Sequence, residues 1–186
     1  MKKALILHGW DGDSQNNWFP WLKEELKNRG YETIIPDLPS SSLPKLSEQL
    51  GAIEKYASEL HEGDVIVGHS LGCQLATQFI EKHALKNLTV LLVAPTYSGL
   101  GEELGRETFG DAYETISQYY DTPNTFEDLQ NTHVVFLSEN DPYINLQNAE
   151  EYYCQFSDME FVEFSNKGHF NSTAGVFELP ELLEYV

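Results

Sequence analysis

Basic residues are scarce in this sequence, and this deficit argues against polyanionic partners. The 186 residues contain 11 Lys and Arg against 30 Asp and Glu, for a formal net charge of −19 at pH 7. A protein of that charge repels phosphate backbones and anionic lipid headgroups. We therefore expect neither nucleic acid nor a membrane surface as a partner.

Cysteine is also rare. Cys73 and Cys154 are the two cysteines of the chain, and their separation matches no metal-ligand or redox spacing such as C-x-x-C. We predict that both are free thiols and that the chain has no metal site.

Long hydrophobic runs are missing. No stretch approaches the roughly 18 consecutive apolar residues that a membrane span requires. Lys2 and Lys3 precede a short apolar run at 4–7, but that run is too short for the hydrophobic region of a signal peptide. We expect a cytoplasmic protein.

The remaining composition is that of a globular domain. Hydrophobic residues make up 41% of the chain and charged residues 22%, which are ordinary values. A chain of this length buries roughly 70% of the surface that its unfolded state exposes. We expect residues 1–186 to form a single domain.

Short apolar runs alternate with segments of helical periodicity. Strands are predicted at 4–7, 31–35, 64–67, 88–94, 133–137 and 160–164, and helices at 18–30, 46–60 and 71–83. This alternation is typical of parallel βαβ units in an α/β fold. The runs at 4–7, 65–67 and 90–93 are continuously apolar, as expected of strands buried on both faces.

A long segment, 96–132, separates the fourth and fifth predicted strands. It is too long for a plain loop, and we expect one or two short helices in it, with 113–120 the best candidate. Its charged residues are one base, Arg106, and the acids Glu102, Glu103, Glu107, Asp111, Glu114, Asp121, Glu127 and Asp128. One hypothesis is that this insertion forms a small cap over the residues described next.

The sharpest local motif is Gly68-His69-Ser70-Leu71-Gly72, which fits G-x-S-x-G. It follows a predicted strand and begins a predicted helix, which is the context of a nucleophile elbow. The glycines Gly68 and Gly72 allow the strand and helix backbones to approach closely. The structural alternative is a glycine-rich turn whose serine caps the helix.

A serine nucleophile needs a histidine base and a carboxylate that orients the histidine. Asp141 follows the fifth predicted strand and His169 follows the sixth. The order Ser, Asp, His is that of the α/β-hydrolases, and loops after parallel strands open on one edge of the sheet. Glu139 is an alternative orienting group, and Asp141 could instead be a turn residue before Pro142.

The oxyanion of acyl transfer needs two backbone N–H donors. Leu71 follows the nucleophile, and Trp10 lies in the turn after the first predicted strand. We predict that these two residues supply the donors. Asp11 and Asp13 in the same turn would disfavour anionic substrates.

Together these motifs resemble the small serine hydrolases of the YdeN and retinoblastoma-binding protein 9 type. The resemblance rests on residues 7–10, 17–22, 68–72, 140–142 and 168–170. It implies a minimal α/β-hydrolase fold, a three-layer αβα sandwich around a six-stranded parallel sheet in the order 2-1-3-4-5-6. It also implies a triad of Ser70, His169 and Asp141 and no cofactor. The lipase-type His-Gly-Gly-Gly motif is replaced by His-Gly-Trp-Asp at 8–11.

The leading hypothesis is therefore a serine hydrolase that acts on a small-molecule acyl substrate. A short-chain carboxylesterase (class EC 3.1.1) or thioesterase is favoured over a lipase, because the insertion is acidic where a lipase has an apolar lid. An amidase or peptidase stays open, as does the oligomeric state. The alternative is a non-catalytic binding protein that uses the acidic insertion as a docking surface for a basic partner.

Overall fold

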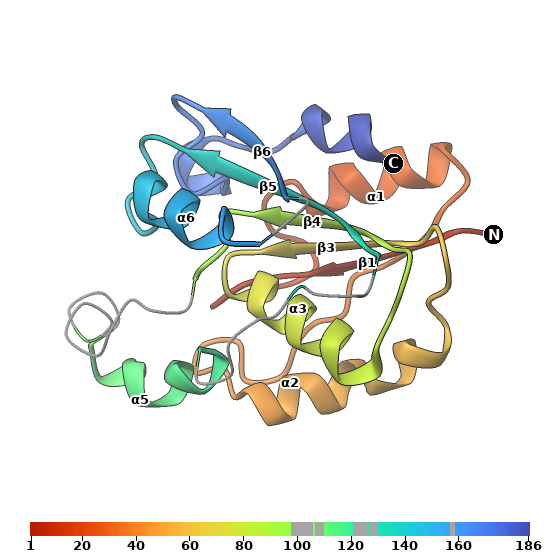
Figure 1. Ribbon diagram of the computed structural model, residues 1–186, viewed down its shortest axis with the longest axis horizontal. Helices are drawn as coiled ribbons and strands as arrows, with labels where there is room; N and C mark the ends of the chain where they lie inside the picture. The colour runs from red at the N-terminus through yellow and green to blue at the C-terminus, as the bar shows by residue number, and fades with distance from the viewer. Residues whose placement is uncertain (98–105, 107–109, 121–125, 127–129, 157–158) are drawn as a thin grey trace.

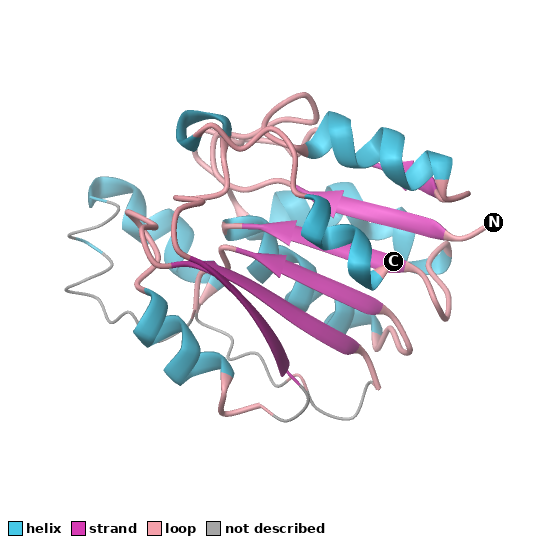
Figure 2. Ribbon diagram, turned by 90° about the horizontal axis from the view of Figure 1, so that it is seen from above, coloured by secondary structure: helices cyan, strands magenta, loops and turns pink. Residues whose placement is uncertain are grey.

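The protein is organised around one parallel sheet. A computed structural model describes residues 1–97, 106, 110–120, 126, 130–156 and 159–186. Its strands are β1 (Lys3–Leu7), β2 (Glu32–Ile34), β3 (Val65–His69), β4 (Thr89–Val93), β5 (Thr132–Ser138) and β6 (Met159–Phe164). They lie in the order β2-β1-β3-β4-β5-β6 with every neighbouring pair parallel. Figure 2 shows strands of the sheet side by side and pointing in one direction. The predicted sheet and its order are confirmed.

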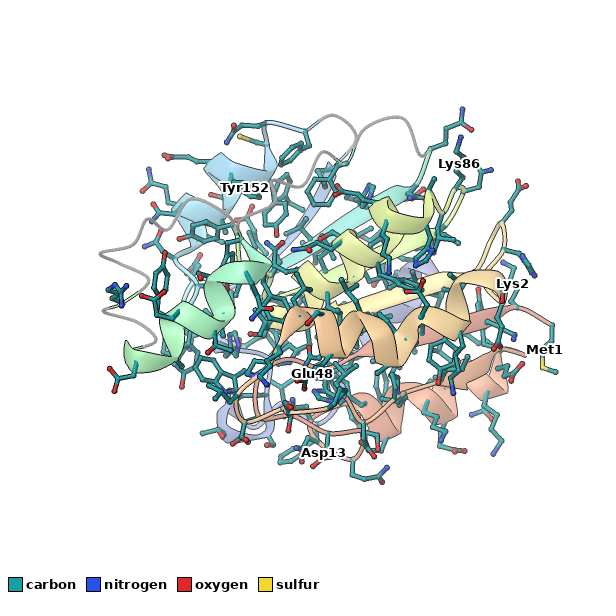
Figure 3. The ribbon with its side chains drawn as sticks, turned by 90° about the horizontal axis from the view of Figure 1, so that it is seen from below. Met1, Lys2, Asp13, Glu48, Lys86 and Tyr152 are labelled. Carbon is teal, nitrogen blue, oxygen red and sulfur yellow. The ribbon has the colours of Figure 1, made fainter. Side chains whose placement is uncertain are left out.

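Helices cover both faces of the sheet and complete three layers (Figure 1). One face carries α1 (Phe19–Asn28) and the C-terminal 3₁₀ helix η5 (Pro180–Tyr185), and the Arg29 guanidinium joins them by donating to the Val186 carbonyl at 3.0 Å. The other face carries α2 (Leu46–Ile53), α3 (Leu71–His83) and α6 (Leu146–Tyr153). Figure 3 views this face, with α2 and α3 in front of the sheet and Glu48 labelled on α2.

The helix boundaries follow local signals in part. Pro20 lies in the first turn of α1, where its missing N–H has no partner to lose. The helix predicted at 46–60 is divided into α2 and a 3₁₀ segment, η1 (Glu54–Ser58), because the backbone tightens after Ile53. The short helix α6 was not predicted from the sequence; its local signal is Asn145, whose side-chain oxygen accepts the Asn148 N–H at the start of the helix.

The hydrophobic core lies along the central strands. Residues 4–7, 65–67 and 90–93 are all buried, as their continuous apolar runs predict, whereas every residue of the edge strand β6 is half-buried or exposed. Trp18 is completely buried, and its indole N–H donates to the Phe170 carbonyl at 2.9 Å. An aromatic side chain of this size removes about 150–250 Å² of surface from water, so Trp18 anchors the start of α1 against the loop after β6.

The described part of the insertion is helical. It comprises η2 (Gly110–Ala112), α5 (Tyr113–Ile116) and η3 (Ser117–Tyr119), in the region where a helix is predicted. The Tyr119 hydroxyl donates to Gln49 of α2 at 2.7 Å, and Gln78 of α3 donates to the Tyr119 carbonyl at 2.6 Å. This segment therefore packs beside α2 and α3, at the lower left of Figure 1. Across the described residues, no helix is both long enough and apolar enough to span a membrane.

Candidate active site

Ser70 lies at the sharp turn between β3 and α3. Its φ and ψ are 53° and −122°, a conformation that costs a residue other than glycine about 1–3 kcal/mol. Two hydrogen bonds of 2.9 Å hold the turn, from the Ser70 N–H to the Val93 carbonyl and from the Cys73 N–H to the Ser70 carbonyl. The sheet and the helix thus hold Ser70 in a strained conformation typical of a nucleophile elbow.

The glycines of the motif are required by close backbone approach. A Cβ atom on Gly68 would lie 2.6 Å from the Cys73 Cα, and a Cβ atom on Gly72 would overlap the Leu7 carbonyl. Neither contact is with a flexible side chain that could move away. Any side chain at either position would push α3 off β1 and β3, as predicted from the motif.

His169 and Asp141 meet at the carboxyl edge of the sheet, from the loops after β6 and β5. The His169 Nδ1 lies 2.8 Å from one Asp141 carboxylate oxygen and 3.1 Å from the other. The Asp141 side chain is only 1% exposed, and its Oδ1 also accepts the Tyr143 and Ile144 N–H groups at 2.9 and 3.0 Å. An ionised carboxylate only accepts hydrogen bonds, so this contact requires a proton on His169 Nδ1.

The alternative orienting group, Glu139, is exposed. Its backbone N–H donates to the Phe164 carbonyl at 2.8 Å, which places it in the turn without bringing its carboxylate to the histidine. The pairing with His169 therefore falls to Asp141.

Two further residues, which the sequence analysis missed, hold these loops together. The Asn140 side-chain oxygen accepts the Gly168 N–H at 2.8 Å and the Ser138 hydroxyl at 2.9 Å. Ser138 Oγ in turn accepts the Lys167 N–H at 2.9 Å. The available signal was the presence of Ser138 and Asn140 shortly before Asp141. Serine and asparagine are common in turns because their side chains form hydrogen bonds with the nearby backbone.

His69, inside the elbow, contacts the backbone of His169. Its Nε2 lies 2.9 Å from the His169 carbonyl oxygen, which can only accept, so the proton is on Nε2. Burial, and then the proximity of His169, lower the pKa of His69 to about 3. His69 is therefore a neutral donor that positions the backbone of His169.

The turn after β1 lies against the elbow. A Cβ atom on Gly9 would lie 2.9 Å from the Ser70 Cβ and 3.4 Å from the Leu71 nitrogen. Leu71 is the first residue of α3, and the first N–H groups of a helix have no partner within it. The backbone of the turn and the start of the helix thus meet beside Ser70, and the oxyanion role of Trp10 and Leu71 stays a prediction.

Ser70, His169 and Trp10 line one cleft of about 550 Å³. Among the described residues, Ser70 has no hydrogen bond to His169, and such bonds often form only when substrate is present. Apart from Ile144, the other lining residues are small or polar: Gly9, Asp11, Gly12, Asn16, Asn17, His69, Thr96, Tyr143, Asn171, Ser172 and Thr173. The described helical segment 110–119 is not among them, and the rest of the hypothetical cap lies largely outside the described residues.

Comparisons with known proteins identify a family and a similar fold. The family model described as serine hydrolase matches residues 4–186. The YdeN hydrolase of Bacillus subtilis is 29% identical over 96% of this chain and 91% of its own length, and the serine hydrolase RBBP9 of Rattus norvegicus is 28% identical over 99% and 93%. The crystal structure of the B. subtilis ydeN gene product superposes with a TM-score of 0.83 at 25% identity, covering 99% of this chain and 96% of that one.

Proposed function

Because the chain belongs to the serine hydrolase family, we propose that it cleaves a small ester or thioester through a catalytic triad of Ser70, His169 and Asp141. The observation that carries the proposal is the hydrogen bond between His169 Nδ1 and Asp141 beside the strained elbow of Ser70. Because this bond engages Nδ1, the other ring nitrogen, Nε2, is the one proposed to take the Ser70 proton in the cleft that both residues line.

The first half of the reaction forms an acyl-enzyme. Ser70 Oγ attacks the carbonyl carbon while His169 Nε2 takes the hydroxyl proton. The carbonyl electron pair moves to the oxygen, where the Trp10 and Leu71 N–H groups stabilise the negative charge. As the tetrahedral intermediate collapses, the bond to the leaving alcohol or thiol breaks, and His169 returns the proton to the leaving atom.

The second half releases the acid. A water molecule gives its proton to His169 Nε2 and attacks the acyl carbon, and the proton then returns to Ser70 Oγ as the ester bond breaks. Asp141 keeps its negative charge throughout and stabilises the imidazolium that forms twice in the cycle.

The cleft favours a small substrate. Its volume of about 550 Å³ and its mostly polar lining suit a short acyl ester better than a long-chain lipid, since lipid sites are predominantly apolar. We therefore propose carboxylesterase-type activity, class EC 3.1.1, with thioesters as a second acyl class.

Fluorophosphonate labelling followed by intact-mass spectrometry tests the triad. We expect one adduct on the wild-type protein, none on Ser70→Ala, and slowed labelling of His169→Ala. The matched control is Ser58→Ala, which replaces an exposed serine in η1 and should be labelled like wild type. A folded wild-type protein that takes no adduct would contradict the proposal and favour the non-catalytic binding role.

A further inference from the structure

One end of the cleft is formed by two loops that are far apart in the sequence. Asn17 precedes α1, and Asn171 lies two residues beyond His169; both line the cleft. The Ser172 N–H donates to the Asn17 side-chain oxygen at 2.9 Å, which joins the two loops directly. The two asparagine side chains therefore belong to one polar corner beside His169.

The hydrogen bonds settle how both amides are turned. A backbone N–H can only donate, so the Asn17 contact with Ser172 is made by the side-chain oxygen. The Asn171 side-chain oxygen likewise accepts the Ala174 N–H at 2.9 Å. Within the described part of the chain neither Nδ2 group has a hydrogen-bond partner, and each carries two N–H donors. This corner of the cleft therefore presents donors.

The position beside His169 indicates which part of a substrate reaches these donors. The histidine hands its proton to the leaving atom, so the leaving group lies against the imidazole. Donors bind oxygen acceptors, and the net charge of −19 with Asp11 in the same cleft disfavours anionic acceptors. Ether, hydroxyl and amide oxygens remain.

We infer that Asn17 and Asn171 are specificity-determining residues that bind the leaving group and select alcohols carrying an uncharged oxygen acceptor. The inference rests on the proposed esterase function and names its substrate class. Esters of hydroxylated or ether-bearing alcohols should be cleaved faster than esters of plain alkyl alcohols of the same size.

The test uses two esters of equal size, 2-methoxyethyl acetate and butyl acetate, which differ by one oxygen in place of a methylene group. Both yield the same acetyl-enzyme, so any difference in kcat/KM arises in acylation. Rates are measured by pH-stat titration and divided by the alkaline hydrolysis rate of each ester. We expect wild type to prefer 2-methoxyethyl acetate about 10-fold, and each variant, Asn17→Asp and Asn171→Asp, to lose about 3- to 10-fold of that preference.

The aspartate variants are matched to the geometry. Aspartate keeps the oxygen that accepts the Ser172 or Ala174 N–H but has no side-chain donor. Asn17 also has a positive φ of 55°, a conformation that offers an alternative, purely structural reason for asparagine at this position. The variant Asn17→Gly keeps that conformation while removing the side chain. If Asn17 only shaped the loop, both Asn17→Asp and Asn17→Gly would keep the wild-type preference between the two esters.

Fluorophosphonate labelling distinguishes a failure of the proposed function from a failure of the leaving-group subsite. An unlabelled wild-type protein would overturn the proposed function itself. Normal labelling with a corrected ester preference near one, or a preference unchanged in both aspartate variants, would overturn the leaving-group subsite alone.

Discussion

The two walls of the cleft are stabilised in different ways. The wall after β5 and β6 is held by a partly buried network in which Asn140 and Ser138 bind the His169 loop, Asp141 binds the imidazole and His69 binds the His169 carbonyl. The turn after β1 is held largely by its neighbour segment 38–42: the Asp11 N–H donates to Ser41 at 2.7 Å and the Trp10 indole to Ser42 at 2.9 Å. Both donors are partly or fully exposed.

This difference indicates which wall of the site tolerates substitutions. Breaking a buried hydrogen bond leaves an unsatisfied polar group, whereas an exposed one is replaced by water. The turn after β1 also has buried hydrogen bonds, since the His8 Nε2 accepts the Leu38 N–H at 2.9 Å and the His8 Nδ1 lies 2.9 Å from the Gly9 carbonyl oxygen. We therefore expect the wall of His169 to be the more sensitive of the two.

The largest effect is expected at Asp141. Asp141→Asn keeps the shape of the side chain but removes the charge and disturbs the histidine tautomer, so kcat should fall by about 10⁴-fold. Steady-state hydrolysis of 2-methoxyethyl acetate measures the loss. The matched control is Glu139→Gln, two residues earlier and exposed, which should stay within about 2-fold of wild type; a large loss there instead would reassign the orienting carboxylate.

A smaller effect is expected at Asn140. Asn140→Ala removes the acceptor of the Gly168 N–H and the Ser138 hydroxyl, which lets the histidine loop shift. A displacement near 1 Å costs about 10²-fold, so kcat should fall by about 10- to 100-fold with little change in KM. Unfolding in urea should show a loss of about 1–3 kcal/mol. A normal kcat in Asn140→Ala would show that the network does not position His169.

The pH dependence of the free energy of unfolding should reveal the contribution of His69. Its pKa is about 3 in the folded protein and near 6.5 when unfolded. Between these values the unfolded state binds a proton that the folded state does not, so the free energy of unfolding decreases as pH falls below 6.5, by up to about 1.4 kcal/mol per unit.

His69→Gln keeps a side-chain donor for the His169 carbonyl but does not titrate. Between pH 7.5 and 4.5, wild type should therefore lose about 2–3 kcal/mol more stability than His69→Gln. Urea unfolding at the two pH values measures this difference. Burial also lowers the pKa of His8 and that of His133, the latter to about 4, so the variant should retain part of the acid sensitivity; identical losses in both proteins would contradict the role of His69.

The smallest effect is expected on the turn after β1. Trp10→Phe removes the exposed indole bond to Ser42 but keeps the backbone N–H that we propose as an oxyanion donor. We expect kcat/KM within about 3-fold of wild type and a stability change below about 1 kcal/mol. A loss comparable to that of Asn140→Ala would show that both walls are equally sensitive.

Much of the fold was predictable because its signals are local. Continuous apolar runs identified the central strands, and the helix after Ser70 begins and ends as predicted at 71–83. The end of α2 was harder, because the chain continues directly into the 3₁₀ helix η1 with no glycine or proline in it to mark the change. The short α6 was missed because eight residues carry little periodicity.

The candidate site was predictable in its members but not in its contacts. The position of Ser70 in its motif, and of Asp141 and His169 after their strands, follows from chain order and parallel topology. That order cannot decide which of Glu139 and Asp141 reaches the histidine, since both follow the same strand. The backbone turn after β5 decides it, and the deciding bonds join residues 28 positions apart.

By itself, the sequence determined the α/β architecture, the elbow and the chain order of its reactive groups, because each depends on residue type and spacing over a few positions. The tertiary structure alone decided the pairing of Asp141 with His169, the neutral support from His69 and the donor corner made by Asn17 and Asn171. The bond from Ser172 to Asn17 spans 155 positions. Such contacts depend on how distant loops converge at one edge of the sheet, and short-range patterns carry no information about that convergence.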